Sequence, residues 1–127
     1  MTELPPLGLG HPRTELRRQL VASVLSGEKT ATAGLLAEYE EEGEAIPSVG
    51  ERFTLDDYDD EPVAVVELTE VRIVPAAEID VDFARDEGEG FATVEDWRLA
   101  HERFFERPIP PDMQIVALRF RVVERLP

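Results

Sequence analysis

The sequence predicts an α+β domain in which helices pack around a curled mixed β-sheet or barrel. Helical and strand-like segments follow one another without the regular alternation of a βαβ protein. The segment Val63–Val74 is rich in β-branched residues, and its apolar residues occupy even positions up to 68 and odd positions from 71. A strand cannot change its buried face without an irregularity. We therefore expect a bulge or bend near Thr69–Glu70, as is common where sheets curl.

Four segments carry helical patterns. The first has apolar residues at helical spacing, with Thr14 as its candidate N-cap and Gly27 as its candidate C-terminal glycine. Apolar spacing and a following glycine predict a second helix over Thr32–Glu42. A short helix is expected over Asp80–Glu87, and a capping-box pattern at Thr93 opens the last one.

Two further segments complete the predicted domain. Arg52–Asp56 is expected to be a short strand, and Gln114–Val123 a last strand in which apolar residues alternate with arginines. Residues 1–13 show no periodicity and are expected to form an N-terminal arm. The length then predicts a single domain over residues 14–127.

Composition narrows the possible functions. Thirteen basic and 28 acidic residues give a formal net charge of −15, which opposes non-specific binding to polyanions. Cysteine is absent, which excludes disulfides and thiolate chemistry. The N-terminus lacks a secretory pattern and no apolar run is long enough to span a membrane, so we expect a cytoplasmic protein. For its oligomeric state we expect a monomer or a homodimer. The acidic runs at 38–44 and 56–61 are interpreted as solvated surface.

Lys29 is the only lysine in a chain whose other basic residues are arginines. If the second helix begins near Thr30, Lys29 and Thr32 project from its first turn toward one side. A hydroxyl beside an amine is a candidate nucleophile–base pair, and lysine can lose its proton in a desolvated pocket where arginine cannot. The alternatives are a phosphate contact or no function.

Glu87 and His101 are weaker candidates on the residues alone. Glu87 ends a predicted helix directly before glycines, where its side chain reaches either a pocket rim or solvent. His101 shares a helix side with Trp97, which is typical of a core histidine. The two histidines are far apart and predict no metal site, and no glycine-rich phosphate loop or nucleotide fingerprint predicts a cofactor.

Six segments, taken together, resemble the ASCH domain family, which belongs to the larger group with PUA-like barrels. The motif Gly27-x-Lys29-x-x-Thr32 is weak alone, but the ordered set is specific and covers residues 14 to 123. The segments are SGEKTATAGLL at 26–36, IPSVGERF at 46–53, PVAVVELTEV at 62–71, FARDEGEGF at 83–91, WRLAHERFF at 97–105 and IVALRFRVV at 115–123.

The resemblance implies a PUA-like barrel with a cleft beside the lysine motif. It also implies that the partner is RNA or a modified nucleoside. One branch of the family resembles amidohydrolases that remove the acetyl group of N4-acetylcytidine, and another is associated with ribonuclease activity. By match to the amidohydrolase motif, the candidate catalytic residues are Lys29, Thr32 and Glu87. The candidate substrate-binding residues are Gly27, Thr30, Glu89, Trp97 and His101.

Three functions therefore remain open. In an amidohydrolase acting on N4-acylated cytidine, Thr32 attacks the acyl carbonyl, Lys29 takes its proton and Glu87 assists. In an RNA-binding module or ribonuclease, Lys29 contacts a phosphate. In a non-catalytic binder of a nucleobase-like ligand, Trp97 or Tyr39 stacks on the base.

Overall fold

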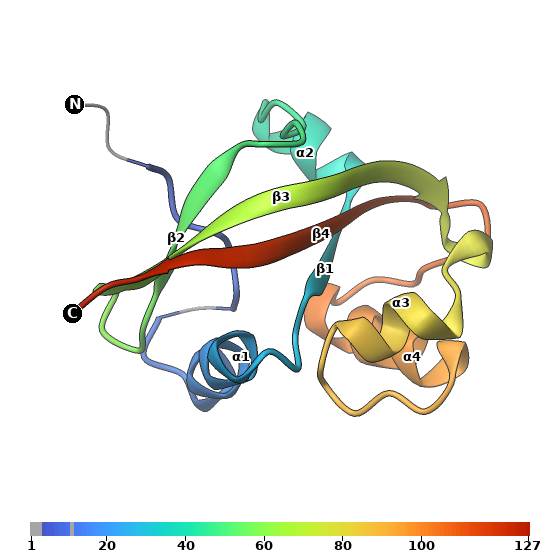
Figure 1. Ribbon diagram of the computed structural model, residues 1–127. Coiled ribbons are helices and arrows are strands. Elements are labelled where there is room, and N and C mark those ends of the chain that lie inside the picture. Colours follow the sequence, from blue (N-terminus) through green and yellow to red (C-terminus); the bar gives the residue numbers. More distant parts are fainter. Residues whose placement is uncertain (1–3, 11) are drawn as a thin grey trace.

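The structure, a computed structural model, describes residues 4–10 and 12–127. Its central feature is a four-stranded antiparallel sheet in the order β1-β4-β3-β2 (Figure 1). The strands are β1 (Ala31–Leu35), β2 (Arg52–Asp56), β3 (Pro62–Pro75) and β4 (Gln114–Arg125). The helices are α1 (Glu15–Ser26), α2 (Leu36–Glu42), α3 (Val81–Asp86) and α4 (Val94–Phe105), with a 3₁₀ turn, η1 (Ala76–Glu78), after β3.

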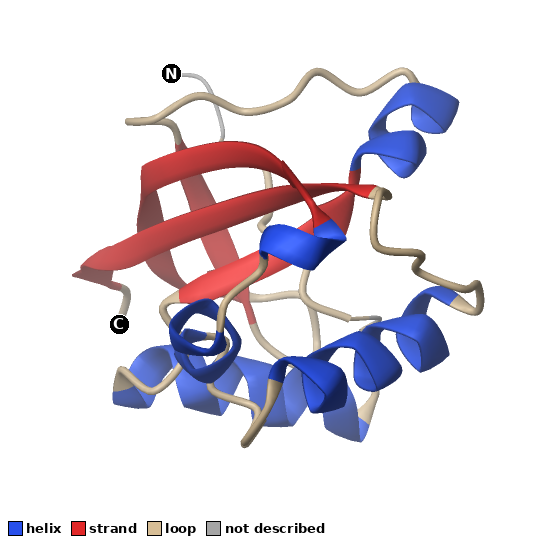
Figure 2. Ribbon diagram, turned by 90° about the vertical axis from the view of Figure 1, so that its right-hand side faces the viewer, coloured by secondary structure: helices blue, strands red, loops and turns tan. Residues whose placement is uncertain are grey.

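The sheet curls because the pairing of β3 with β4 contains two register shifts. Residues 68 and 70 of β3 pair with consecutive residues of β4, so Thr69 is an extra, unpaired residue. Such a bulge bends the strand and increases its twist. Figure 2 shows the strands curving into a half-barrel. The expected irregularity near Thr69 is confirmed, and so is the curled α+β fold class.

The ends of the helices match the capping patterns in the sequence. The Thr14 hydroxyl accepts a hydrogen bond from a backbone N–H of α1, and Gly27 ends that helix at a φ of 88°. Asp80 and Thr93 cap α3 and α4 in the same way as Thr14. In the described part of the chain, no helix has the length and apolar character needed to cross a membrane.

Two apolar clusters hold the helices against the sheet. The first core packs α1 and the N-terminal segment on the sheet; its buried members are Leu7, Leu9, Leu20, Val21, Val24, Leu55, Ala64, Val66, Leu68, Val116, Leu118 and Phe120. The second core joins β1 and β4 to η1, α3 and α4; its buried members are Ala31, Leu35, Ala76, Ile79, Phe83, Ala84, Trp97, Ile109, Ile115 and Ala117. β4 serves both cores because successive side chains of a strand point to opposite faces. The segment that joins α1 to β1 therefore runs from the first core to the second.

The second predicted helix is wrong over its first part. Residues 32–35 belong to β1, and α2 begins only at Leu36. β1 pairs with β4 along its whole length, which satisfies backbone groups that would otherwise remain open at that edge of the sheet. This tertiary pairing overrides the helical pattern. Lys29 and Thr32 are consequently not on the first turn of a helix: Lys29 precedes β1, and Thr32 lies within it.

The N-terminal segment lies along β2 and covers part of the first core. Backbone hydrogen bonds of 2.9 Å join Leu7 to Thr54 and Thr54 to Pro5, and the side chains of Leu7 and Leu9 are buried. The predicted arm is thus packed over its described part. Residues 1–3 and 11 of that arm lie outside the described residues.

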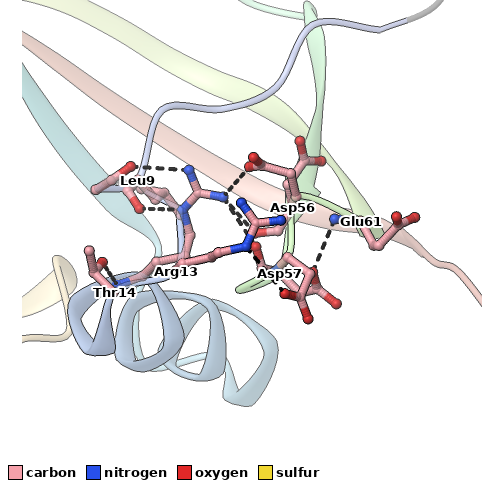
Figure 3. A network of polar contacts seen from close by, with 10 residues as sticks. Leu9, Arg13, Thr14, Asp56, Asp57 and Glu61 are labelled. Atoms are coloured by element: carbon pink, nitrogen blue, oxygen red, sulfur yellow. Dashed lines mark hydrogen bonds and ion pairs between the residues drawn. The ribbon is translucent and has the colours of Figure 1, made fainter.

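A buried guanidinium, that of Arg17 on α1, fastens this segment to the domain. Its Nε donates to Leu9 O at 2.9 Å and its Nη2 to Gly10 O at 3.1 Å. Its Nη1 donates to Asp57 O at 3.2 Å and to Asp60 Oδ1 at 3.0 Å. Figure 3 shows this network between the N-terminal segment and the turn that joins β2 to β3. One side chain therefore ties three parts of the chain together.

Candidate active site

Lys29 is held in the short connection between α1 and β1. The chain turns at Gly27, and the backbone N–H of Lys29 then donates to Ser23 O at 3.0 Å. The N–H of Thr30 donates to Asp86 O, at the end of α3, at 2.7 Å. These bonds fix the backbone on both sides of the side chain, and Lys29 is only 2% exposed.

Acceptors surround the Lys29 ammonium. Its Nζ donates to Ala31 O at 2.8 Å and to Glu87 O at 3.2 Å. The same atom lies 3.7 Å from Glu87 Oε1 and 3.6 Å from Glu89 Oε2. Lys29 therefore forms ion pairs with both glutamates in addition to its two hydrogen bonds to carbonyl groups.

Gly88 allows the two glutamates to approach Lys29. Its φ is 70°, and a Cβ at this position would lie 2.7 Å from Lys29 N and 2.7 Å from Ser23 Oγ. The Ser23 hydroxyl also donates to Gly88 O at 3.1 Å. Only glycine combines this backbone conformation with so close an approach. The turn after α3 can therefore present Glu87 and Glu89 on either side of the ammonium.

Helix α4 supports Glu87 from its other side. The Trp97 indole N–H donates to Glu87 Oε2, and His101 Nε2 lies 3.3 Å from Glu87 Oε1. His101 Nδ1 lies 2.8 Å from Trp97 O, one helical turn earlier. The two rings stack with their centroids 4.4 Å apart. Glu87 is 1% exposed, so protein groups supply its described partners.

Two groups of the cluster titrate away from their ordinary range. Burial alone would lower the pKa of His101, but its hydrogen bond to Glu87 and the charge of that carboxylate outweigh burial and raise the pKa. Burial raises the pKa of Glu89 and outweighs the opposite effect of the Lys29 ammonium. The shift of His101 is thus caused mainly by Glu87, whereas that of Glu89 is caused mainly by burial.

A cavity of about 750 Å³ opens beside this cluster. This volume lies within the range of small-molecule sites. The N-terminal segment, α1, β1, α2, β2 and α4 all contribute to its wall. Thr32 pairs with Leu118 of β4, and directly opposed residues of an antiparallel pair lie on the same face. Both residues line the cavity.

The structure brings most of the predicted site residues to this cavity. Its lining includes Lys29, Thr32, Glu87, Glu89 and His101. Three predicted substrate-binding residues are not part of that lining: Gly27, Thr30 and Trp97. Gly27 ends α1, Thr30 acts through its backbone, and Trp97 lies in the second core, where it orients Glu87.

Part of the cavity wall was not expected from the sequence. The acidic run at 38–44, interpreted as solvated surface, contributes Glu38, Tyr39, Glu42 and Glu44. Burial raises the pKa of Glu38 and that of Tyr39, so these two side chains are not fully solvated. The N-terminal segment adds residues 6–10. The one signal for this wall in the sequence was Tyr39, an aromatic residue within the acidic run.

The fold and the site define a class: a small PUA-like α+β half-barrel with a buried lysine–carboxylate cluster beside a cavity. The family model described as the ASCH domain matches residues 10–124, and the chain belongs to this family. Membership indicates an RNA-binding or related, nucleic-acid-associated function. No curated protein sequence matches the chain.

Solved structures support the same assignment. Protein EF3133 from Enterococcus faecalis V583 is 31% identical, with a TM-score of 0.86 over 98% of this chain and 79% of that one. An ASCH domain from Lactobacillus crispatus JV V101 is also 31% identical, with a TM-score of 0.75 over 84% of this chain and 72% of that one. The hypothetical protein PH0355 is 11% identical, with a TM-score of 0.61 over 83% of this chain and 92% of that one, and shows the fold alone.

Proposed function

We propose that the protein is an amidohydrolase that removes the acyl group from N4-acylated cytidine. The observation that carries the proposal is the convergence of Lys29, Thr32 and Glu87 on one cavity. Lys29 and Thr32 lie three residues apart, whereas Glu87 comes 58 residues after Lys29, and the cavity has room for a nucleoside-sized ligand. A hydroxyl, an amine and a carboxylate in one pocket provide a nucleophile, a base and a proton acceptor.

The proposed reaction has an acylation and a hydrolysis step. The Thr32 hydroxyl attacks the acyl carbonyl carbon, a C–O bond forms and Lys29 takes the hydroxyl proton. The C–N bond then breaks, and the amine leaves with that proton. Water hydrolyses the resulting ester, and the Thr32 oxygen regains a proton. The products are cytidine and a carboxylic acid.

Lys29 must release a proton before it can act as a base. Its ammonium lies within 3.7 Å of the carboxylate of Glu87 and within 3.6 Å of that of Glu89. The raised pKa of Glu89 suits that carboxylate to accept the Lys29 proton. A substrate in the cavity would exclude water, and the lost hydration of the two charged groups would favour transfer of the proton and a neutral pair.

The charge of the cavity favours a nucleoside over an RNA strand. Among the described residues, its lining contains six glutamates, at positions 38, 42, 44, 51, 87 and 89, whereas Lys29 and Arg103 are its lysine and arginine. This distribution repels a phosphate backbone. An RNA-binding or ribonuclease role for Lys29 would require its ammonium to meet phosphate at a site where two carboxylates already compensate it.

The test is incubation of the purified protein with N4-acetylcytidine and chromatography of the products. We expect cytidine and acetate from the unmodified protein, and loss of most activity in Thr32→Val, because the nucleophile is removed. Thr30→Val is the matched control, since Thr30 does not line the cavity and keeps its backbone bonds. Full activity in Thr32→Val, or cleavage of RNA without deacetylation, would contradict the proposal.

A further inference from the structure

The hydrogen bonds of His101 determine where its ring carries hydrogen. Nδ1 lies 2.8 Å from the carbonyl oxygen of Trp97, which can only accept, so Nδ1 is protonated. A neutral ring would then direct the lone pair of Nε2 at Glu87 Oε1, 3.3 Å away. A carboxylate oxygen is also only an acceptor, so this contact would contain no hydrogen.

Glu87 is not free to turn away from this contact. Its other oxygen, Oε2, accepts the indole N–H of Trp97, and the residue is almost fully buried. An imidazolium at His101 resolves the conflict, because Nε2 then donates to Oε1. Both carboxylate oxygens of Glu87 then accept a hydrogen bond from α4, Oε2 from Trp97 and Oε1 from His101.

We propose that His101 is an imidazolium at neutral pH, paired with Glu87, and that its charge loosens the hold of Glu87 on the Lys29 proton. The cluster then contains two cations and two anions, with Glu89 as the second anion. Because the positive and negative charges are equal in number, no buried charge in the cluster is left uncompensated. His101 and Lys29 share one carboxylate, so each cation weakens the attraction of Glu87 for the other.

The second half of this proposal rests on the proposed function, because it explains how a lysine beside two carboxylates acts as a base. His101 acts through Glu87 and is a positioning residue. The titratable groups that face it are Glu87 and Glu89 from the segment after α3, with Lys29 on their far side. Its ring otherwise contacts the aromatic side chains of Phe91, Trp97 and Phe105.

The charge of His101 is measurable by nitrogen NMR of the imidazole without any enzyme assay. The chain has two histidines, so His11→Gln leaves His101 as the single signal. We expect both ring nitrogens to carry hydrogen at pH 7, which requires a titration midpoint above that pH and hence above the ordinary histidine value of about 6.5. Hydrogen on one nitrogen only at pH 7 would overturn the proposal, and this measurement needs no change in the cluster.

Two variants then assign the cause. Glu87→Gln is expected to move the midpoint below the ordinary histidine value, because burial then dominates. Glu89→Gln removes only a weaker, longer-range contribution and is expected to lower the midpoint less. An unchanged midpoint in Glu87→Gln would show that Glu87 does not hold the charge and would overturn the pairing.

The effect on Lys29 is read from the pH dependence of deacetylation. His101→Gln removes the charge, so we expect the acid limb of the kcat/KM profile to move to higher pH and kcat/KM at pH 7 to fall about tenfold. Phe91→Leu alters packing on the same ring without a charge and is expected to leave the limb in place. An unmoved limb in His101→Gln would overturn the role toward Lys29. If the unmodified protein deacetylates nothing, the proposed function fails, whereas the NMR titration still decides the charge of His101.

Discussion

Two buried cations, Arg17 and Lys29, lie in different surroundings. Arg17 is 8% exposed, and its guanidinium donates mainly to backbone carbonyls, with one carboxylate, Asp60, at its edge. Lys29 is more deeply buried, and two carboxylates lie within 4 Å of its Nζ. Lys29 lines the cavity and Arg17 does not.

This difference indicates that Arg17 has a structural role, whereas Lys29 is a candidate catalytic residue. The guanidinium offers five donors in a fixed plane and stays charged, which suits a group that joins chain segments through their carbonyls. The ammonium of lysine can lose its proton, and nearby carboxylates can receive it. Burial alone does not distinguish the two residues, whereas the nature of their partners and access to the cavity do.

The largest effect is expected from Lys29→Arg. This substitution keeps the charge but cannot deprotonate near neutral pH. We expect deacetylation to fall by ~10²–10⁴-fold, as for a lost acid–base group, and nearly as far as in Lys29→Ala. Turnover of N4-acetylcytidine by each variant is the measurement.

A steric loss at Lys29 would give the same result, so substrate binding must be measured beside turnover. We expect the affinity for cytidine to fall much less than the rate. Substantial activity in Lys29→Arg would exclude the base role. Lys29 would then resemble Arg17 in contributing only a permanent positive charge and its hydrogen bonds.

Arg17→Leu is expected to affect stability rather than chemistry. Its loss removes the guanidinium donors from the carbonyls of Leu9, Gly10 and Asp57, of which Asp57 O keeps the N–H of Asp60. We expect the free energy of unfolding to fall by about 2–4 kcal/mol. Urea unfolding measures this change. Arg17→Lys keeps the charge but has fewer, unfixed donors, and should recover only part of the loss. Recovery of full stability in Arg17→Lys would mean that the positive charge, rather than the set of N–H donors on the planar guanidinium, holds the N-terminal segment in place.

Gly88 and Gly90 form a natural pair for testing how the turn after α3 positions the site. Both have positive φ, so alanine is strained at either position, by about 1–2 kcal/mol. A Cβ at Gly90 meets nothing within 4 Å, whereas one at Gly88 would lie 2.7 Å from Lys29 N. We expect Gly88→Ala to cost about 1–3 kcal/mol more stability than Gly90→Ala.

The same pair should differ in activity. Gly88→Ala displaces the backbone that carries Lys29, so deacetylation should fall in the fraction that remains folded, while Gly90→Ala retains it. Equal stability and equal activity of the two variants would show that the close approach at Gly88 does not position the cluster.

These local features also show what the sequence could predict. Helix caps depend on neighbours within a few residues, and Thr14, Gly27 and Thr93 were identified from such patterns. The bulge at Thr69 followed from the change of apolar phase within one segment. β1 was missed because its conformation depends on β4, some 80 residues later, which no local pattern reports.

The candidate site also contains features that the sequence predicted and features that only the structure revealed. Lys29, Thr32 and Glu87 were candidates from the residues alone, and the family resemblance strengthened them; the structure adds that all three line one cavity. Trp97, which the sequence left open as either a core residue or a stacking partner for a ligand, lies in the second core and donates to Glu87. Neither that contact nor the wall made by the N-terminal segment could be predicted, because both join residues that are distant in sequence or depend on packing.

The smallest effect concerns the acidic wall of the cavity. Its glutamates repel added negative charge, so we expect cytidine 5′-monophosphate to bind several-fold more weakly than cytidine, with a gap that narrows as salt is raised. Calorimetric titration of both ligands at low and high salt measures this difference.

A paired substitution separates the local wall from the net charge of −15. Glu42→Gln with Glu44→Gln removes two charges from the lining, and Glu78→Gln with Glu124→Gln removes two from exposed positions outside it. Only the first pair should bring the affinity for the monophosphate closer to that for cytidine, because screening limits the reach of the distant charges to about 10 Å at 0.1 M salt. Equal effects of the two pairs would mean that the whole protein, rather than its cavity, discriminates against phosphate. In that case the lining of the cavity would give no reason of its own to prefer a nucleoside to RNA at Lys29, and the preference would rest on the net charge alone.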